Sequence, residues 1–131
     1  MNYSIIIPVL NEEKNLSKLI PEIFFRLKKV SFELIIIDDN SEDNTSILIK
    51  KLKRKNLKYF IRKKDKDLSR ACIYGFEKSK FKNVIVMDGD FQHKPKDILK
   101  LISSFEKNKA DIVIGTRNLF KKNDNILSFL R

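Results

Sequence analysis

Five short apolar runs, separated by stretches with the periodicity of helices, constrain the fold of this chain more than any other feature of its sequence. The apolar runs occupy residues 3–9, 33–37, 57–62, 83–87 and 111–114. The stretches between them, residues 12–29, 41–54, 68–80 and 95–107, repeat apolar residues at intervals of three or four, as one face of a helix does. Strands that are apolar throughout and alternate with helices are typical of a parallel sheet covered by helices on both faces. We therefore expect an α/β fold of three layers, with a mostly parallel sheet and alternating βα units.

Two of the expected helices carry signals for their ends and their buried faces. Helix 41–54 opens with a polar segment in which Ser41, together with Asn44 or Thr45, is expected to cap the first turn. Helix 95–107 begins with Pro95. Its residues expected to face inward are Ile98, Leu99, Ile102 and Phe105.

The composition limits the class of protein. With 42% hydrophobic and 34% charged residues, the 131-residue chain is expected to fold as one globular domain, residues 1–131. The formal net charge of +11 favours an anionic partner, although the excess of Lys (22) over Arg (6) is also what a coding bias toward Lys, Ile and Asn would give. Cys72 is the only cysteine, so the chain has no intramolecular disulfide and no cysteine-rich metal site.

The sequence shows no membrane-spanning or targeting segment. No apolar run approaches the roughly 20 residues of a transmembrane helix. The N-terminus leads directly into a strand-like run, without the pattern of a signal peptide. These features predict a cytoplasmic protein, with peripheral attachment to the cytoplasmic face of a membrane left open.

The positive charge also raises the question of nucleic acid binding. The basic segment 50–66 has no recognisable nucleic-acid-binding motif, and Tyr59 and Phe60 are its aromatic residues. A charge run of this kind is more often a solvated helix face, so we expect no nucleic acid partner.

Four segments that follow apolar runs carry residues able to bind a ligand. They are residues 11–13 (Asn-Glu-Glu), 38–41 (Asp-Asp-Asn-Ser), 88–90 (Asp-Gly-Asp) and 115–117 (Gly-Thr-Arg). In open parallel sheets, ligands bind outside the carboxyl ends of the strands. These residues are therefore the candidates for chemistry, and acidic residues after three of the five runs exceed what helix capping explains.

Asp88 and Asp90 give the sharpest signal. Two carboxylates two residues apart in an extended turn can reach one hard cation, and Gln92 can add an amide oxygen. Mg²⁺ and Mn²⁺ favour such oxygen ligands and complete their shell with phosphate oxygens and water. The alternative is that Asp88 caps a turn and Asp90 is solvated. At the end of a buried strand we favour the metal.

The remaining polar candidates allow two interpretations each. Asp38 and Asp39 can accept hydrogen bonds from a ribose hydroxyl or a base N–H, or can cap the following helix. Glu12 can bind a ligand or complement the dipole of the first helix. Arg117 can hold a phosphate with its planar fork or lie in solvent. His93 can bind metal or phosphate, but a histidine in a surface turn is the favoured interpretation.

Segments along nearly the whole chain resemble, in order, the motifs of family 2 glycosyltransferases with the Rossmann-like GT-A fold. The opening strand of that family, which runs into Pro-x-x-Asn-Glu, is matched by IIIPVLNEEKNL. Its second strand and Asp-Asp-x-Ser turn are matched by LIIIDDNSEDNT, and the stretch that opens its third helix by DLSRACIYGF. The Asp-x-Asp-x-Gln-His-x-Pro segment of its dolichyl-phosphate mannose synthase and polyprenyl-phosphate sugar synthase branch is matched by VIVMDGDFQHKPKDI. The fifth strand of that branch, followed by Gly-Ser-Arg, is matched by DIVIGTRNLF.

This resemblance implies a nucleotide-sugar-binding site and the roles of its residues. The implied site consists of Pro8, Leu10, Glu12, Ile37, Asp39, Asp88, Gly89, Asp90 and Arg117. The first five would line the base and ribose pocket, and residues 88–90 would meet the diphosphate. Asp88, Asp90 and Gln92 would hold Mg²⁺ or Mn²⁺. Asp90 and Arg117 would be the catalytic residues, with Arg117 facing the phosphates or the acceptor.

The same resemblance implies a reaction. A sugar would move, with inversion, from a UDP- or GDP-linked donor to an acceptor, expected to be a polyprenyl or dolichyl phosphate at a membrane surface. A lipid phosphate is already ionised and needs little help from a general base, which agrees with our finding no separate base in the sequence.

The sequence departs from the family pattern in three places. Leu10 stands where this branch commonly has Tyr or Phe, which predicts weaker stacking on the base. Lys94 replaces the first Pro of a Pro-Pro pair. The Gly-rich stretch has lost most of its glycines: Asp67, Ser69 and Arg70 surround Leu68, and only Gly75 remains downstream.

The chain is also shorter than the catalytic domains of this family. We therefore expect a C-terminally truncated domain or half of a split enzyme, with weak catalysis by this chain alone. Apolar residues near its end predict self-association or a C-terminal partner chain; they are Leu119, Phe120, Ile126, Leu127, Phe129 and Leu130. A nucleotide-diphosphate-binding remnant without activity is the alternative function.

A receiver-like signalling domain is a further α/β candidate, and the sequence argues against it. That class places a phosphorylated Asp after its third strand and a Lys after its fifth. Here the third run ends in Arg62 and is followed by two lysines, and the fifth is followed by Gly-Thr-Arg.

Overall fold

The computed structural model of this protein describes residues 1–64 and 66–116. The chain divides into two compact units, Met1–Leu99 and Lys100–Arg131, and each is considered by itself. The first unit contains, in chain order, β1 (Asn2–Val9), α1 (Glu13–Arg26), β2 (Ser31–Asp38), α2 (Thr45–Lys51), β3 (Leu57–Ile61), α3 (Leu68–Lys78) and β4 (Asn83–Val86). Helix α4 (Pro95–Asn108) begins in the first unit and ends in the second.

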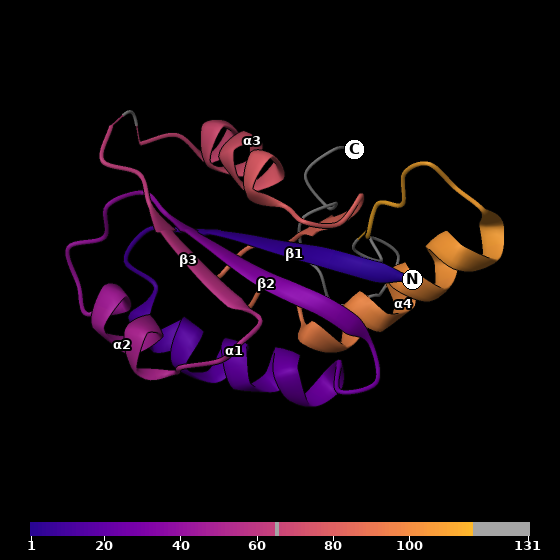
Figure 1. Ribbon diagram of the computed structural model, residues 1–131, viewed down its shortest axis with the longest axis horizontal. Helices are drawn as coiled ribbons and strands as arrows, with labels where there is room; N and C mark the ends of the chain where they lie inside the picture. The colour runs from indigo at the N-terminus through magenta and orange to yellow at the C-terminus, as the bar shows by residue number, and fades with distance from the viewer. Residues whose placement is uncertain (65, 117–131) are drawn as a thin grey trace, which may run out of the picture. The chain divides into compact units, whose positions relative to one another are not determined.

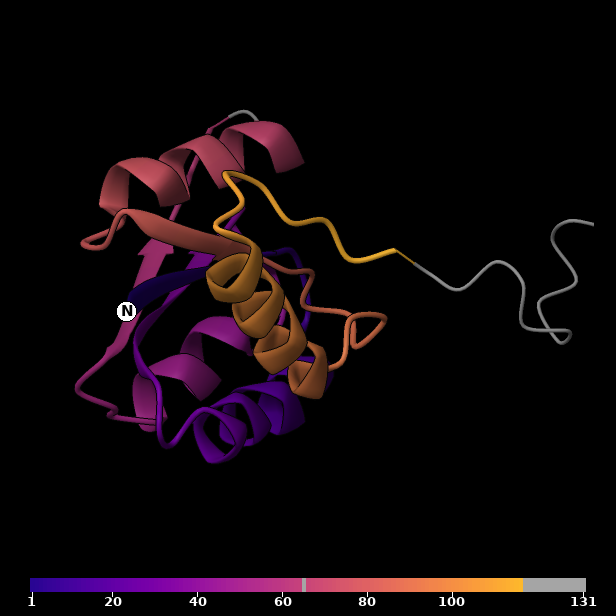
Figure 2. The same ribbon diagram turned by 90° about the vertical axis from the view of Figure 1, so that its right-hand side faces the viewer.

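A parallel sheet of four strands forms the centre of the first unit (Figure 1). Its strand order is β3-β2-β1-β4, and all three neighbouring pairs are parallel. Figure 2 shows α1 and α2 on one face of the sheet and α3 on the other. Every residue of β1 and β2 after the first is buried, because each strand has neighbours on both edges and helices on both faces. The predicted α/β fold with a mostly parallel sheet of alternating βα units is confirmed.

The strand order creates a switch point beside β1. From β1 the chain builds β2 and then β3 on one side, and it returns to the other side of β1 to form β4. The loops that follow β1 and β4 therefore begin at adjacent carboxyl ends of the sheet. In open α/β sheets this is the place where ligands bind.

Helix α3 packs closely on the sheet through small side chains. Ala71 lies in a buried cluster with Ile6, Ile35 and Ile37. A Cβ atom added at Gly75 would lie 2.5 Å from Cγ2 of Ile6, so glycine at this position lets the helix approach β1. This contact sets the distance between α3 and β1.

Three expectations about the helices were wrong. The N-cap residue of α2 is Asn44, without a side-chain cap hydrogen bond, and Ser41 instead donates both its N–H and its hydroxyl to Asp38. Helix α1 covers Glu13–Arg26 rather than residues 12–29, and α2 covers Thr45–Lys51 rather than residues 41–54. At the start of α4, Ile98 is buried as expected, but Leu99 is 39% exposed.

The fifth strand expected at residues 111–114 is also absent from the described part of the chain. This segment has no regular secondary structure, and Ile112 and Ile114 are 78% and 79% exposed. A strand is stabilised by pairing with a neighbour, and the described residues of the second unit, 100–116, contain no other strand. The apolar run alone did not reveal this.

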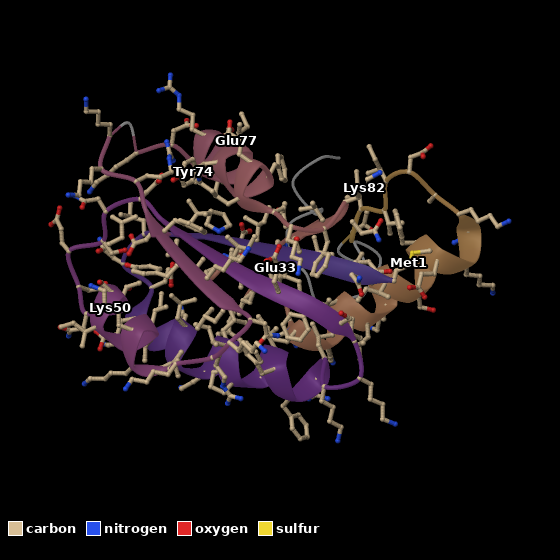
Figure 3. All side chains as sticks on the ribbon, in the orientation of Figure 1. Met1, Glu33, Lys50, Tyr74, Glu77 and Lys82 are labelled. Atoms are coloured by element: carbon tan, nitrogen blue, oxygen red, sulfur yellow. The ribbon has the colours of Figure 1, made fainter. Side chains whose placement is uncertain are left out.

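A buried carboxylate joins three strands to the α3–β4 connection near the amino ends of the strands. Glu33 lies on β2 and is 4% exposed (Figure 3). Its Oε1 accepts hydrogen bonds from the Ser4 hydroxyl and the Lys80 N–H, both at 2.6 Å, and its Oε2 lies 2.7 Å from Nζ of Lys58. The Phe81 N–H donates to the same Ser4 hydroxyl oxygen at 3.1 Å. Burial raises the pKa of Glu33, but its hydrogen bonds, that from Lys58 first, outweigh burial and hold the pKa below its ordinary value.

Replacing Glu33 with Gln should destabilise the fold, because the amide keeps the shape of the side chain but cannot pair with the lysine charge. We expect the free energy of unfolding at neutral pH to fall by about 2 kcal/mol, the scale of a hydrogen bond to a charged group. The lowered pKa of Glu33 gives the pH dependence its sign. The contribution is fully present above the pKa of an unfolded Glu, about 4.3, and is lost as the pH falls through the folded pKa.

Urea unfolding of wild type and Glu33→Gln at neutral and acidic pH measures this effect. The matched control is Glu22→Gln, which removes an exposed pair with Arg26 on α1 and should cost less than about 0.5 kcal/mol. Equal stabilities of the two variants at neutral pH would contradict the assignment.

Candidate functional site

The loops after β1 and β2 are tied together by hydrogen bonds at the carboxyl edge of the sheet. The Asn11 N–H donates to Oγ of Ser41 at 2.8 Å, and the Glu42 N–H donates to Oδ1 of Asn11 at 2.7 Å. Asn11 has a φ of 58°, in the left-handed region that Asn tolerates better than most residues. The side chain and backbone of Asn11 therefore set the path of the loop that carries Leu10 and Glu12.

Asp38 is a buried acceptor that holds the loop after β2 in place through Ser41. It is 1% exposed, and its Oδ1 accepts from the N–H and the hydroxyl of Ser41, both at 2.7 Å. Its Oδ2 accepts from the hydroxyl of Tyr59 on β3. Burial and the bond to Asp38 raise the pKa of Tyr59 above its ordinary value, so this hydroxyl keeps its proton and remains a donor. Both oxygens of Asp38 are thus used inside the fold.

Asp39 belongs to a different group of contacts. Its Oδ1 lies 2.6 Å from Nη1 of Arg62, and its Oδ2 accepts from the Asp67 N–H at 2.9 Å. These partners lie at the end of β3 and just before α3, so the side chain of Asp39 is directed to the α3 side of the edge. Neither Asp38 nor Asp39 caps α2, which begins at Thr45.

The Asp-Gly-Asp segment follows β4 directly. The Met87 N–H continues the ladder by donating to the Ile6 carbonyl at 3.1 Å. A Cβ atom added at Gly89 would lie 3.1 Å from Cγ1 of Val9 and 3.8 Å from Cγ of Glu12. The loop after β4 therefore runs against the end of β1 and the residue that precedes α1, as the switch point predicts.

The side chains of this segment are partly engaged with the loop itself. Nδ1 of His93 lies 3.3 Å from the Asp88 backbone nitrogen and 3.5 Å from Oδ2 of Asp88. Oδ1 of Asp90 accepts the Gln92 N–H at 2.9 Å, which fixes the turn after the segment. The side chain of Asp88 is 48% exposed, so this carboxylate can be approached from solvent.

Cys72 shows that the acidic groups of separate strands converge. Burial raises the pKa of this thiol, and so do the negative charges of Asp88, Asp39 and Asp67 in turn. The thiol of Cys72 on α3 thus interacts electrostatically with carboxylates that follow β2 and β4. Asp39 and Asp88 therefore both lie within electrostatic reach of this one thiol.

The donor set after β4 suits a metal ion that takes its remaining ligands from a diphosphate and water. Among residues 1–64 and 66–116, no three His, Cys, Asp or Glu side chains form a group suited to hold a metal. Asp88, Asp90 and Gln92 offer two carboxylates and one amide at an approachable loop, which is the small oxygen set of a cation that takes its other ligands from phosphate and water. The residues present therefore fit a metal bound together with a diphosphate.

The other residues of the expected nucleoside pocket differ in accessibility. Pro8 and Ile37 are register partners on β1 and β2, and both are buried. Leu10 is 43% exposed. Glu12 is half-buried, and its Oε2 accepts from the Asn15 side chain at 2.7 Å, a contact within the first turn of α1. Arg117 lies outside the described residues.

The sequence analysis missed the roles of Arg62, Asp67 and Tyr59. The sequence indicated Arg62 only as a residue that argues against a receiver-like domain. It indicated Asp67 only as a departure from the glycine-rich pattern of the family. An arginine directly after a strand whose neighbour ends in two acidic residues was the available signal.

None of the helices in the described part of the chain combines the length and the apolar character that crossing a membrane requires.

Comparison with known proteins places the chain in a family. Residues 4–129 match the family described as Glycosyl transferase family 2. The dolichol-phosphate mannosyltransferase of Pyrococcus furiosus is 41% identical over 118 residues, which cover 89% of this chain and 33% of that protein. The chain spans between 33% and 50% of the length of the first four curated relatives it matches.

Solved structures share the fold at lower identity. Glucosyl-3-phosphoglycerate synthase from Mycobacterium tuberculosis, in complex with Mn²⁺, UDP and phosphoglyceric acid, has a TM-score of 0.68 and 20% identity, over 79% of this chain and 38% of that one. The mannosyltransferase PcManGT from Pyrobaculum calidifontis, in complex with GDP-Man and Mn²⁺, has a TM-score of 0.64 and 18% identity, over 86% and 33%. The solved structures share the fold of this chain, and the family model matches most of its sequence. The chain therefore belongs to glycosyl transferase family 2.

Proposed function

We propose that this chain binds a nucleotide-diphosphate sugar and acts in the transfer of its sugar to a polyprenyl or dolichyl phosphate, with inversion. The observation that carries the proposal is that the residues after β2 and β4 meet beside the end of β1: Asp39 and Asp88 are both near Cys72, and Gly89 lies against Val9. Because a nucleoside and its diphosphate are joined covalently, their site needs groups that bind the nucleoside and groups that bind the diphosphate. These groups must lie at neighbouring strand ends.

The nucleoside would lie at the ends of β1 and β2. Asp39 supplies acceptor oxygens for the N–H and O–H donors of a base and a ribose. Leu10 is accessible and can pack against the base. Pro8 and Ile37, which are buried in register behind it, would support the pocket from within the sheet.

The diphosphate would lie against the loop after β4. Gly89 lets this loop lie close to the end of β1, because a Cβ atom at this position would lie 3.1 Å from Cγ1 of Val9. Asp88, Asp90 and Gln92 would hold Mg²⁺ or Mn²⁺ there, and the bound cation would act as a Lewis acid that neutralises the leaving nucleoside diphosphate. The presence of Mn²⁺ in the two solved relatives supports this assignment.

The acceptor and the location follow from the relatives. The Pyrococcus protein is named for dolichol phosphate, which is the support for a lipid phosphate acceptor and for peripheral contact with a membrane. Such an acceptor is ionised at neutral pH, so attack on the anomeric carbon needs no strong base from the protein. Arg117 remains a candidate for holding the phosphates or the acceptor.

A second candidate function is nucleotide binding without transfer. The chain corresponds to half or less of the length of its first curated relatives, and the groups that hold the acceptor can belong to the remainder. Positioning of an acceptor in line with the reacting carbon is worth roughly 7–11 kcal/mol of the barrier. On this second interpretation, donor binding is strong relative to the rate of transfer.

Metal dependence is the first outcome we expect. In calorimetric titrations, UDP or GDP should bind more tightly with Mn²⁺ than in EDTA. Asp90→Asn should remove about 1.5–3 kcal/mol of that difference, the scale of a charged partner. Asp111→Asn, which changes an exposed carboxylate outside the site, is the matched control and should bind as wild type does. Equal affinity with Mn²⁺ and in EDTA would refute the metal assignment.

Asp39→Asn separates the nucleoside from the metal. Because Asp39 contacts neither Asp88 nor Asp90 in any described hydrogen bond, the variant should weaken UDP or GDP binding by about 1–3 kcal/mol and keep the response to Mn²⁺. Binding of inorganic pyrophosphate with Mn²⁺ is the internal control and should not change. If the variant binds nucleotides as wild type does, Asp39 has only a structural role.

Transfer itself can be assayed directly. With Mn²⁺ and a UDP- or GDP-linked sugar, we expect slow formation of a polyprenyl-phosphate sugar whose anomeric configuration is opposite to that of the donor. Product identity by NMR and parallel measurement of donor hydrolysis distinguish transfer from wasteful turnover. Tight nucleotide binding with neither product would support the second candidate function.

A further inference from the structure

The connection between β3 and α3 is fastened to Asp39 from both of its ends. Arg62 follows β3 directly, and Asp67 directly precedes α3. Nη1 of Arg62 lies 2.6 Å from Oδ1 of Asp39, and the Asp67 N–H donates to Oδ2 at 2.9 Å. Nη1 of Arg62 also donates to the Asp67 carbonyl at 3.0 Å, so the three residues form a closed ring of contacts.

This ring is more constrained than an ordinary surface ion pair. The side chains of Arg62 and Asp39 are only 12% and 9% exposed. The Arg62 N–H donates to the Asp38 carbonyl at 2.7 Å, which fixes the arginine at its backbone. The side chain of Asp67 caps α3 by accepting the Arg70 N–H at 2.7 Å. A shift of the Asp39 carboxylate would therefore disturb both the end of β3 and the start of α3.

The ring still leaves Asp39 able to accept from a ligand. Each carboxylate oxygen has two lone-pair sites, and each of the two oxygens of Asp39 has one ring contact. The ring thus sets the direction of the remaining acceptor sites and holds the side chain in one rotamer before a ligand arrives. A side chain that is already immobile loses less conformational entropy on binding.

We propose that Arg62 and Asp67 are positioning residues for nucleoside recognition, which they control by fixing the carboxylate of Asp39. This inference rests on the proposed function and adds to it a residue pair that acts on the ligand through Asp39. Asp67 contributes through its backbone to Asp39 and through its side chain to α3, at a position where the family resemblance leads one to expect glycine.

The test is a double-substitution cycle in the full chain, with two ligands. Wild type, Arg62→Gln, Asp39→Asn and the double variant are titrated by calorimetry with GDP or UDP in the presence of Mn²⁺, and with inorganic pyrophosphate in the presence of Mn²⁺. Arg62→Gln should weaken nucleoside diphosphate binding about fivefold to tenfold, the scale of immobilising one side chain. It should leave pyrophosphate binding unchanged, and the double variant should bind no more weakly than Asp39→Asn.

Two further variants separate positioning from a general effect on folding. Arg26→Gln removes an exposed arginine from a pair on α1 and should change neither ligand's affinity. Arg62→Lys keeps the charge beside Asp39 but lacks the planar fork, so it should restore part of the lost affinity. If Arg62→Gln does not fold, Arg62→Lys carries the test, with an expected affinity for nucleoside diphosphates below that of wild type and unchanged pyrophosphate binding.

Several results would overturn the inference. Nucleoside diphosphate affinity unchanged in both Arg62 variants would do so, as would effects of Arg62→Gln and Asp39→Asn that simply add. An equal loss of pyrophosphate affinity would show a merely structural role. A wild type that binds pyrophosphate but gains nothing from the nucleoside would overturn the positioning role alone, whereas a wild type that binds neither ligand would refute the proposed function as well.

Discussion

The pairing of β1 between β2 and β4 is the constraint on which the rest of the structure depends. It places β1 inside the sheet, where every residue after Asn2 is buried, and it brings the ends of strands that are far apart in sequence to adjacent positions. Close packing reinforces the arrangement at two glycines. Gly75 lets α3 lie against Ile6, and Gly89 lets the loop after β4 lie against Val9. The acidic edge is a consequence of this sheet order.

The polar networks at the two ends of the sheet have different roles. Near the amino ends, Glu33 is satisfied by protein donors from β1, β3 and the α3–β4 connection, and its role is to hold the fold. At the carboxyl ends, Asp38 and Asp39 are neighbours in sequence, but the alternation of a strand directs them to opposite faces. Asp38 ties loops together on one face, while Asp39 stands in a ring of contacts on the other. One dipeptide thus supplies both a structural group and a candidate ligand-binding group.

The periodicity of the sequence was sufficient to predict the four βα units, because burial on both faces leaves a continuous apolar run that few other structures produce. It was insufficient where an element depends on a partner. Residues 111–114 have the composition of a strand, yet Ile112 and Ile114 are exposed and unpaired as a strand in the described part of their unit. Side-chain partnerships across the sheet were equally hidden. Ser41 serves Asp38 rather than α2, and Arg62 binds Asp39, because both choices depend on which loops the sheet order makes neighbours.

The central claim is that a nucleoside diphosphate and a divalent cation bind together at the switch point. The most direct measurement is paramagnetic broadening of assigned backbone amide signals by Mn²⁺ in the presence of GDP or UDP, with Mg²⁺ as the diamagnetic reference. The account predicts that the amides of residues 88–93 broaden first, followed by those of Leu10 and Glu12. The amides of Lys80 and Phe81, which contact the Glu33 network near the amino ends of the strands, should stay sharp. Broadening that begins at Lys80 and Phe81, or that is the same without the nucleotide, would contradict the account.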